Sequence, residues 1–116
     1  MKKILYNQSM EKQELDLILN KLQIGLSERL GKRLAGIYLY GSQARGEARP
    51  DSDIDVLIVL RSEFDYFETM DEISDLAWQI SLDHDVVIAQ VLVHEDEFNH
   101  ADSPFLLCVQ REAVQI

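Results

Sequence analysis

Two short apolar runs in the middle of the chain most constrain its fold: LAGIYLY at residues 34–40 and DIDVLIVL at residues 53–60. Each run is too short for a typical helix, and both are rich in β-branched or aromatic residues, which favour strands. The segment between them opens with Gly41 and contains a proline, so it predicts a turn, one or two helical turns over residues 42–48, and a second break. A β-sheet therefore lies at the centre of the predicted fold.

The flanking segments predict helices and one more strand. Apolar residues recur at three- and four-residue steps over residues 11–32 and 65–82, which indicates amphipathic helices, and Ser9 is a candidate cap for the first. Residues 85–93, DVVIAQVLV, predict a third strand, and Ser103-Pro104 predicts the start of a final helix. This alternating order predicts an α/β (α+β) domain with a small mixed sheet of three to four strands flanked by helices.

The composition bounds the class of protein. A chain of 116 residues can bury a core of its own, so we expect a single domain over residues 1–116. The formal net charge of −10 argues against direct nucleic-acid binding; it fits a basic protein partner or simply solubility. Cys108 is the only cysteine, which excludes an internal disulfide and a cysteine zinc cluster. Since no apolar run approaches the roughly 18 residues of a membrane helix, we expect a soluble, cytoplasmic protein with no membrane partner.

Two aspartates stand at the start of the second apolar run. Asp53 and Asp55 alternate with Ile54, so on a strand their side chains share a face, with Cα atoms roughly 6.5 Å apart. Two neighbouring carboxylates repel each other, and a divalent cation relieves that repulsion. Mg²⁺ prefers hard oxygen ligands, and enzymes of phosphoryl transfer often hold two ions about 3.5–4 Å apart. The pair therefore predicts a site for Mg²⁺, with two ions.

The first apolar run ends in a predicted anion site. Gly41 and Ser42 form a sharp turn at which backbone N–H groups and a hydroxyl can face outward, the arrangement that binds phosphate. Arg45, one helical turn further on, can present its guanidinium group to the same phosphate oxygens. The segment therefore combines an anion site with a cation site.

Two other binding motifs are excluded by the residues at their key positions. Gly41 and Gly46 have the spacing of a Walker loop, but Glu47 stands where the loop needs lysine. A calcium loop that begins at Asp51 would need glycine at its sixth position and glutamate at its twelfth, where this chain has Val56 and Ser62.

The spacing of the surviving residues resembles a known signature. Gly41-Ser42, ten residues, then Asp53-Ile54-Asp55 is similar to the G-S-x10-D-x-D pattern of the nucleotidyltransferase superfamily that includes DNA polymerase β. More closely, GSQARGEARPDSDIDVLIVL resembles the core of minimal nucleotidyltransferase (MNT) proteins. These are short prokaryotic chains encoded beside HEPN-domain partners, many of them as the antitoxin of a toxin–antitoxin pair. The resemblance implies the polymerase β-like nucleotidyltransferase fold.

The resemblance also implies roles for single residues. Gly41 and Ser42 would hold the triphosphate of ATP, Arg45 would steady phosphate, and Asp53 and Asp55 would bind the catalytic Mg²⁺ ions. Ser42 and the two aspartates thus form the implied catalytic set.

The family usually carries a third carboxylate on a later strand, as a metal ligand or as the base for the attacking hydroxyl. Asp85 opens the predicted strand 85–93 and is the candidate for this catalytic and metal-binding role. In many relatives the acid is expected one pleat further along, where this chain has Val87. Either Asp85 reaches the site from the entry of the strand, or the chain lacks the third carboxylate.

The reaction implied by the resemblance is adenylylation of a protein. A tyrosine hydroxyl of a HEPN RNase toxin would attack the α-phosphate of ATP, giving a tyrosyl-AMP ester and pyrophosphate, and the toxin would be silenced. A hetero-oligomer with that toxin is the implied assembly. Two alternatives stay open: an acidic antitoxin that acts by binding alone, and a nucleotidyltransferase that modifies a small hydroxyl compound.

Overall fold

The computed structural model describes residues 2–49 and 52–116. Helices and strands alternate along the chain up to β3, as the apolar pattern predicts, and two helices then precede a last short strand. The helices are α1 (Lys2–Leu30), α2 (Gly41–Arg45), α3 (Tyr66–His84), α4 (Glu95–His100) and α5 (Pro104–Glu112), with a 3-10 turn at Gly31–Arg33; the strands are β1 (Leu34–Tyr40), β2 (Ile54–Leu60), β3 (Ile88–His94) and β4 (Val114–Gln115).

The strands form one mixed sheet in the order β3-β2-β1-β4. β1 runs antiparallel to β2 and to β4, whereas β2 and β3 are parallel. This sheet with its flanking helices confirms the predicted fold class. In the register of β1 and β2, Tyr40 pairs with Asp55, so the end of β1 meets the start of β2. The segment that leaves β1 at Gly41 therefore returns to the same edge of the sheet.

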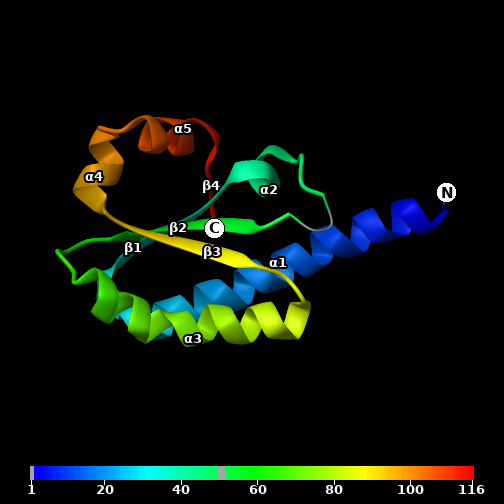
Figure 1. Ribbon diagram of the computed structural model, residues 1–116, viewed down its shortest axis with the longest axis horizontal. Coiled ribbons are helices and arrows are strands. Elements are labelled where there is room, and N and C mark those ends of the chain that lie inside the picture. Colours follow the sequence, from blue (N-terminus) through cyan, green and yellow to red (C-terminus); the bar gives the residue numbers. More distant parts are fainter. Residues whose placement is uncertain (1, 50–51) are drawn as a thin grey trace.

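Helices cover both faces of the sheet. Figure 1 shows α1 and α3 side by side on one face, and α4 and α5 on the other. Alternate residues of β2 serve the two faces, which is why the run is apolar at almost every position. The core under α1 and α3 includes Ile18, Leu22, Leu26, Ile54, Val56, Ile58 and Ile73, and the core under α4 and α5 includes Leu57, Val59, Leu106 and Val109.

The start of α5 matches the sequence prediction. Ser103 is the N-cap, and its hydroxyl oxygen accepts a hydrogen bond from the Leu106 N–H at 3.1 Å. Pro104 occupies the first turn, where no N–H is needed for a helical hydrogen bond. The prediction for Ser9 is wrong: α1 begins at Lys2, so Ser9 lies inside the helix, and residues 2–8 contain no proline or glycine that would break it.

The start of the third strand also differs from the prediction. Asp85 does not open β3; it caps the C-terminus of α3 in the left-handed conformation, at φ 53° and ψ 50°. A short polar side chain tolerates this conformation, which ends the helix and turns the chain toward the sheet. The six-residue helix α4 and the two-residue strand β4 were not predicted, since segments this short carry too little periodicity.

None of the helices in the described ranges is long and apolar enough to cross a membrane.

Burial along α1 generates a stability prediction. Leu22 is 0% exposed under the sheet, whereas Leu17, on the same helix, is 47% exposed. We expect Leu22→Ala to lower the free energy of unfolding by about 2–5 kcal/mol through the cavity it leaves. Leu17→Ala is the matched control and should change it by less than about 1 kcal/mol. Urea unfolding of both variants measures the change in the free energy of unfolding. Equal changes would contradict the burial of Leu22 between α1 and the sheet.

Candidate functional site

The turn at Gly41 places the backbone of β1 against the side chain of Asp55. Gly41 has φ +74°, a conformation that favours glycine. A Cβ atom added at this position would overlap the Asp55 carboxylate. Glycine is therefore needed here twice, for its backbone conformation and for the close approach of Asp55.

The two aspartates predicted to hold a cation lie where β2 begins. Asp55 is on the strand and half-buried, while Asp53 immediately precedes the strand and is exposed. Burial, together with the negative charge of Asp53, raises the pKa of Asp55; Arg45 opposes this shift and Glu112 adds to it. The pair is thus an electrostatically strained group of oxygen donors, which suits a hard cation such as Mg²⁺.

The predicted anion donors hold a carboxylate from the far end of the chain. The Gly41 N–H donates a hydrogen bond to Glu112 Oε1 at 3.1 Å, and Arg45 Nη1 donates to Glu112 Oε2 at 3.0 Å. Arg45 Nε also donates to Glu47 Oε2 at 3.1 Å. The two hydrogen bonds to Glu112 lower its pKa, and the bond from Arg45 is the larger cause, followed by the bond from the Gly41 N–H. Gly41 and Arg45 therefore do converge on one anionic group.

Ser42 is the residue after Gly41 and is half-buried in α2. Its carbonyl oxygen accepts a hydrogen bond from the Glu47 N–H at 2.9 Å, which closes the turn after the short helix. This bond fixes the backbone that carries Ser42 beside Gly41.

Glu112 is the residue of this site that the sequence did not indicate. It is the last residue of α5 and lies 71 positions from Gly41 in the chain. Its neighbours in sequence form no motif, so only the path of the chain brings it to the site.

Asp85 does not join the other carboxylates. It is exposed at the end of α3, and no group of three acidic, histidine or cysteine side chains within the described ranges is placed to hold a metal ion. On β3, the residue paired with Asp55 is Ala89. Val87 is exposed and uses its carbonyl oxygen to accept the Ile54 N–H at 2.8 Å. Of the two alternatives for the third carboxylate, the structure favours its absence from β3.

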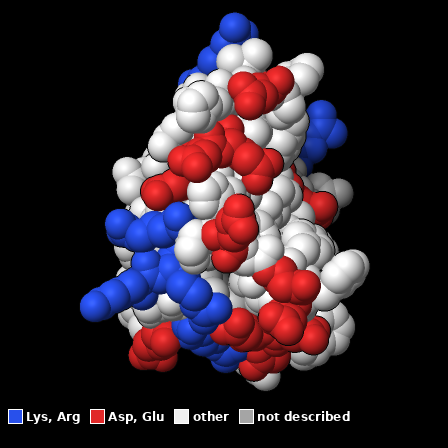
Figure 2. Space-filling view, turned by 90° about the vertical axis from the view of Figure 1, so that its left-hand side faces the viewer, with Lys and Arg blue, Asp and Glu red and all other residues white. Residues whose placement is uncertain are grey.

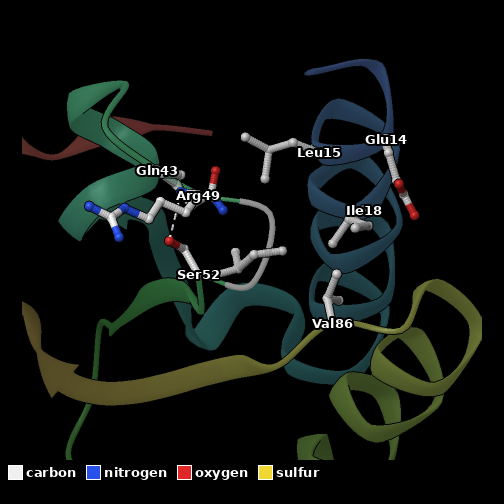
Figure 3. Close-up of a pocket in the computed structure, with 9 residues that line it drawn as sticks. Glu14, Leu15, Ile18, Gln43, Arg49, Ser52 and Val86 are labelled. Atoms are coloured by element: carbon white, nitrogen blue, oxygen red, sulfur yellow. Dashed lines mark hydrogen bonds between the residues drawn. The ribbon is translucent and has the colours of Figure 1, made fainter. Parts of the chain in front are cut away.

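A small cavity lies beside the site but does not contain it. It measures about 80 Å³ and is lined by residues of α1, of α2 and its following segment, by Ile54 at the start of β2, and by Val86. Figure 3 shows Leu15 and Ile18 pointing into it, whereas the Arg49 guanidinium points away; the Arg49 N–H donates to Ser52 Oγ at 2.8 Å. Ligand pockets usually measure roughly 300–1,000 Å³, so this cavity is too small for a nucleotide. Gly41, Asp53 and Asp55 are not among its lining residues.

Comparison with known proteins identifies relatives of this chain. The sequence profile of the nucleotidyltransferase domain matches residues 19–105. A protein of Methanocaldococcus jannaschii named "Putative protein adenylyltransferase MJ0604" is 38% identical over 74 residues, which is 64% of this chain and 68% of the relative. A second protein of that organism with the same description, MJ0141, is 31% identical over 75 residues, or 65% of this chain and 75% of the relative.

Solved structures share the fold. A toxin–antitoxin crystal structure with AMP-PNP contains a chain with a TM-score of 0.58 and 23% identity, over 83% of this chain and 69% of that one. A complex of the tri-AMPylated HEPN toxin of Shewanella oneidensis with an MNT antitoxin gives a TM-score of 0.53 and 22% identity, over 86% and 69%. These findings confirm the resemblance predicted from Gly41-Ser42 and Asp53-Ile54-Asp55.

Two glycines with similar backbones allow a test of the contact at Gly41. Gly46 has φ +72° and nothing within 4 Å of an added Cβ, so Gly46→Ala should destabilise the fold by about 1–2 kcal/mol through backbone strain alone. Gly41→Ala should destabilise it more, because the methyl group must also displace Asp55. Urea unfolding of the two variants compares these costs. Equal destabilisation would show that Asp55 does not press on Gly41.

The raised pKa of Asp55 generates a prediction on pH. Folding raises this pKa, so the ionised carboxylate destabilises the fold above the raised value, and the penalty vanishes at low pH, where folded and unfolded states are both protonated. Asp55→Asn should therefore stabilise the protein at pH 7, and its advantage should shrink as the pH falls through the raised pKa and be nearly lost below the ordinary aspartate pKa of about 4. Urea unfolding across this pH range measures the effect, with the exposed Asp71→Asn as control. A pH-independent difference would contradict the predicted repulsion at Asp55.

Proposed function

Because this chain belongs to the nucleotidyltransferase domain family, we propose that it transfers AMP from ATP to a tyrosine of a partner protein, a HEPN RNase toxin, and so neutralises that toxin. The observation that carries the proposal is the convergence of Gly41, Arg45 and Asp55 at the edge where β1 meets β2. The names of the two archaeal relatives, and the AMPylated HEPN toxin solved with an MNT antitoxin, support the choice of acceptor.

Asp53 and Asp55 are the residues that would hold Mg²⁺. Their fit rests on the donor set: two neighbouring carboxylates, one half-buried and with its pKa raised by burial and by its neighbour. When bound, Mg²⁺ would neutralise charge on the triphosphate and make its α-phosphate easier to attack.

The other residues of the site would bind and orient the triphosphate. The Gly41 N–H and Arg45 Nη1 already donate to two oxygens of a single anion, so they can donate in the same way to phosphate oxygens. The Ser42 hydroxyl, beside Gly41, would be a further donor. The acceptor hydroxyl oxygen forms a bond to the α-phosphorus as the bond to the β-phosphate oxygen breaks. Pyrophosphate leaves, and the hydroxyl proton is released.

The site favours a large acceptor over a small one. The cavity of about 80 Å³ beside these residues is smaller than the roughly 300–1,000 Å³ of typical small-molecule pockets, and Gly41, Asp53 and Asp55 do not line it. A tyrosine on the surface of a protein partner can approach such an open site.

The charge distribution supports a protein partner. The chain has a formal net charge of −10. Figure 2 shows a face on which acidic side chains are widespread, with a group of basic ones at the lower left and others at the top and right. Some of the basic groups form ion pairs within the chain, Arg29 with Asp75 and Arg33 with Glu72. A partner with basic surface groups would be attracted to the remaining acidic area. We propose a hetero-oligomer in the cytoplasm, with residues 1–116 as a single minimal nucleotidyltransferase domain.

One observation favours a second candidate, an antitoxin that acts by binding alone. Ala89, not a carboxylate, stands beside Asp55 on β3, and Asp85 caps α3 and is not part of the strand. A site without a third carboxylate on β3 would transfer nucleotide slowly, and neutralisation would then depend on contact between the two proteins.

A labelling experiment separates the two candidates. The purified chain is incubated with Mg²⁺ and ATP labelled at the α-phosphate in lysate of its own cells. We expect a labelled protein band, reduced by about a hundredfold in the Asp53→Ala, Asp55→Ala double variant because the residues that would hold Mg²⁺ are lost.

The control variant is Asp16→Ala, Asp71→Ala, which removes two exposed aspartates from α1 and α3 and leaves the site intact. It should label like the wild type. Undiminished labelling by the Asp53, Asp55 variant would refute the proposed transfer. If no variant labels a protein but all neutralise the toxin, the binding antitoxin is the correct function.

A further inference from the structure

The carboxylate of Glu112 occupies the donors that the proposed function assigns to phosphate. Glu112 Oε1 accepts from the Gly41 N–H at 3.1 Å, and Glu112 Oε2 accepts from Arg45 Nη1 at 3.0 Å. The Glu112 side chain is 19% exposed, so it is largely enclosed at the end of α5. Both carboxylate oxygens are thus engaged by the two donors that would receive the triphosphate.

A triphosphate and Glu112 cannot use these donors together. Both are anions, and the N–H of Gly41 is one donor with one good direction. The charge of Glu112 also acts on Asp55, whose pKa it helps to raise, so adding phosphate charge with Glu112 in place would increase the repulsion. Binding of the nucleotide therefore requires the carboxylate to leave.

The surroundings allow Glu112 to leave while the donors stay in place. Arg45 keeps a second bond, from Nε to Glu47 Oε2 at 3.1 Å. Gly41 directly follows Tyr40, which the pairing of β1 with β2 holds opposite Asp55. After Glu112, the chain continues through Ala113 into β4, which pairs with β1 at Leu39 and Tyr38. A rotation of the Glu112 side chain is enough to free the donors, with no change in the sheet.

We propose that Glu112 is an internal competitor of the nucleotide: it holds the Gly41 N–H and Arg45 in the free protein and must be displaced by the phosphates, and so sets the nucleotide affinity. This inference rests on the proposed function for the identity of the ligand, but its test needs neither transfer nor a partner.

The test measures binding of ATP and of pyrophosphate, each with Mg²⁺, to the whole chain by calorimetry. Glu112→Gln removes the competing charge and should tighten binding of both ligands by about tenfold, since hydrogen bonds to a charged group are the strong ones. Adenosine, which has no phosphate, should bind wild type and variant equally. Unfolding in urea verifies that each variant is folded.

Glu72→Gln is the matched control. Glu72 also forms an ion pair with an arginine, Arg33, and has a pKa lowered by it, but it lies on α3 across the sheet from Glu112. The substitution changes net charge by the same amount and should leave both affinities within about twofold of the wild type. A gain shared by Glu72→Gln would mean that net charge alone controls affinity, which would overturn the proposal.

Weaker or unchanged binding of ATP and pyrophosphate by Glu112→Gln would also overturn the proposal. Weaker binding would indicate that Glu112 is a ligand of the metal or of the nucleotide. If neither the wild type nor Glu112→Gln binds ATP or pyrophosphate, the proposal is also overturned, because removal of the competitor should expose the donors. If the labelling experiment fails but Glu112→Gln binds ATP and pyrophosphate more tightly than the wild type, the proposed transfer is refuted and this inference stands.

A second measurement uses only the wild-type protein. The chain has 5 glycines, so ¹⁵N-glycine labelling gives a simple amide spectrum. Pyrophosphate with Mg²⁺ should shift the Gly41 resonance, because its N–H exchanges a carboxylate for a phosphate oxygen, and should leave Gly31 in place. Saturable binding without a shift at Gly41 would contradict the exchange.

Discussion

The antiparallel pairing of β1 with β2 is the constraint on which the rest of the site depends. Tyr40 pairs with Asp55, so the last residue of one strand meets the first polar residue of the next. The chain can then turn at Gly41 with its backbone against the Asp55 carboxylate, a contact that only glycine permits. β2 is almost wholly buried and β1 partly buried in a sheet covered on two faces, so packing of the sheet holds this juxtaposition in place.

The same juxtaposition concentrates negative charge. Asp53 and Glu112 both raise the pKa of Asp55, and Arg45 is the cation that opposes them. In the free protein, Glu112 and Glu47 share that arginine. The local fold thus keeps an unfavourable set of carboxylates together, a feature typical of sites that are completed by a ligand. Under the proposed function, Mg²⁺ and a triphosphate would complete this site.

The site was only partly visible in the sequence. The fixed spacing of Gly41-Ser42 and Asp53-Ile54-Asp55 pointed to Gly41 and Asp55, which do come together, because β1 ends where its neighbour β2 begins. The prediction that Asp85 opens the third strand was wrong, because a helix C-cap and a strand entry can look alike when apolar residues follow. Glu112 carried no signal, because its role depends on where α5 ends in space.

By itself, the sequence determined where the longer helices and strands lie and which of their residues face the core, because these follow from the local periodicity of apolar side chains. It also determined the family, through a motif of fixed spacing. The tertiary structure alone decided which distant groups meet: Glu112 at the Gly41 N–H, and Ala89 beside Asp55. Such contacts depend on strand register and on the path of the chain between elements, which local residue patterns do not encode.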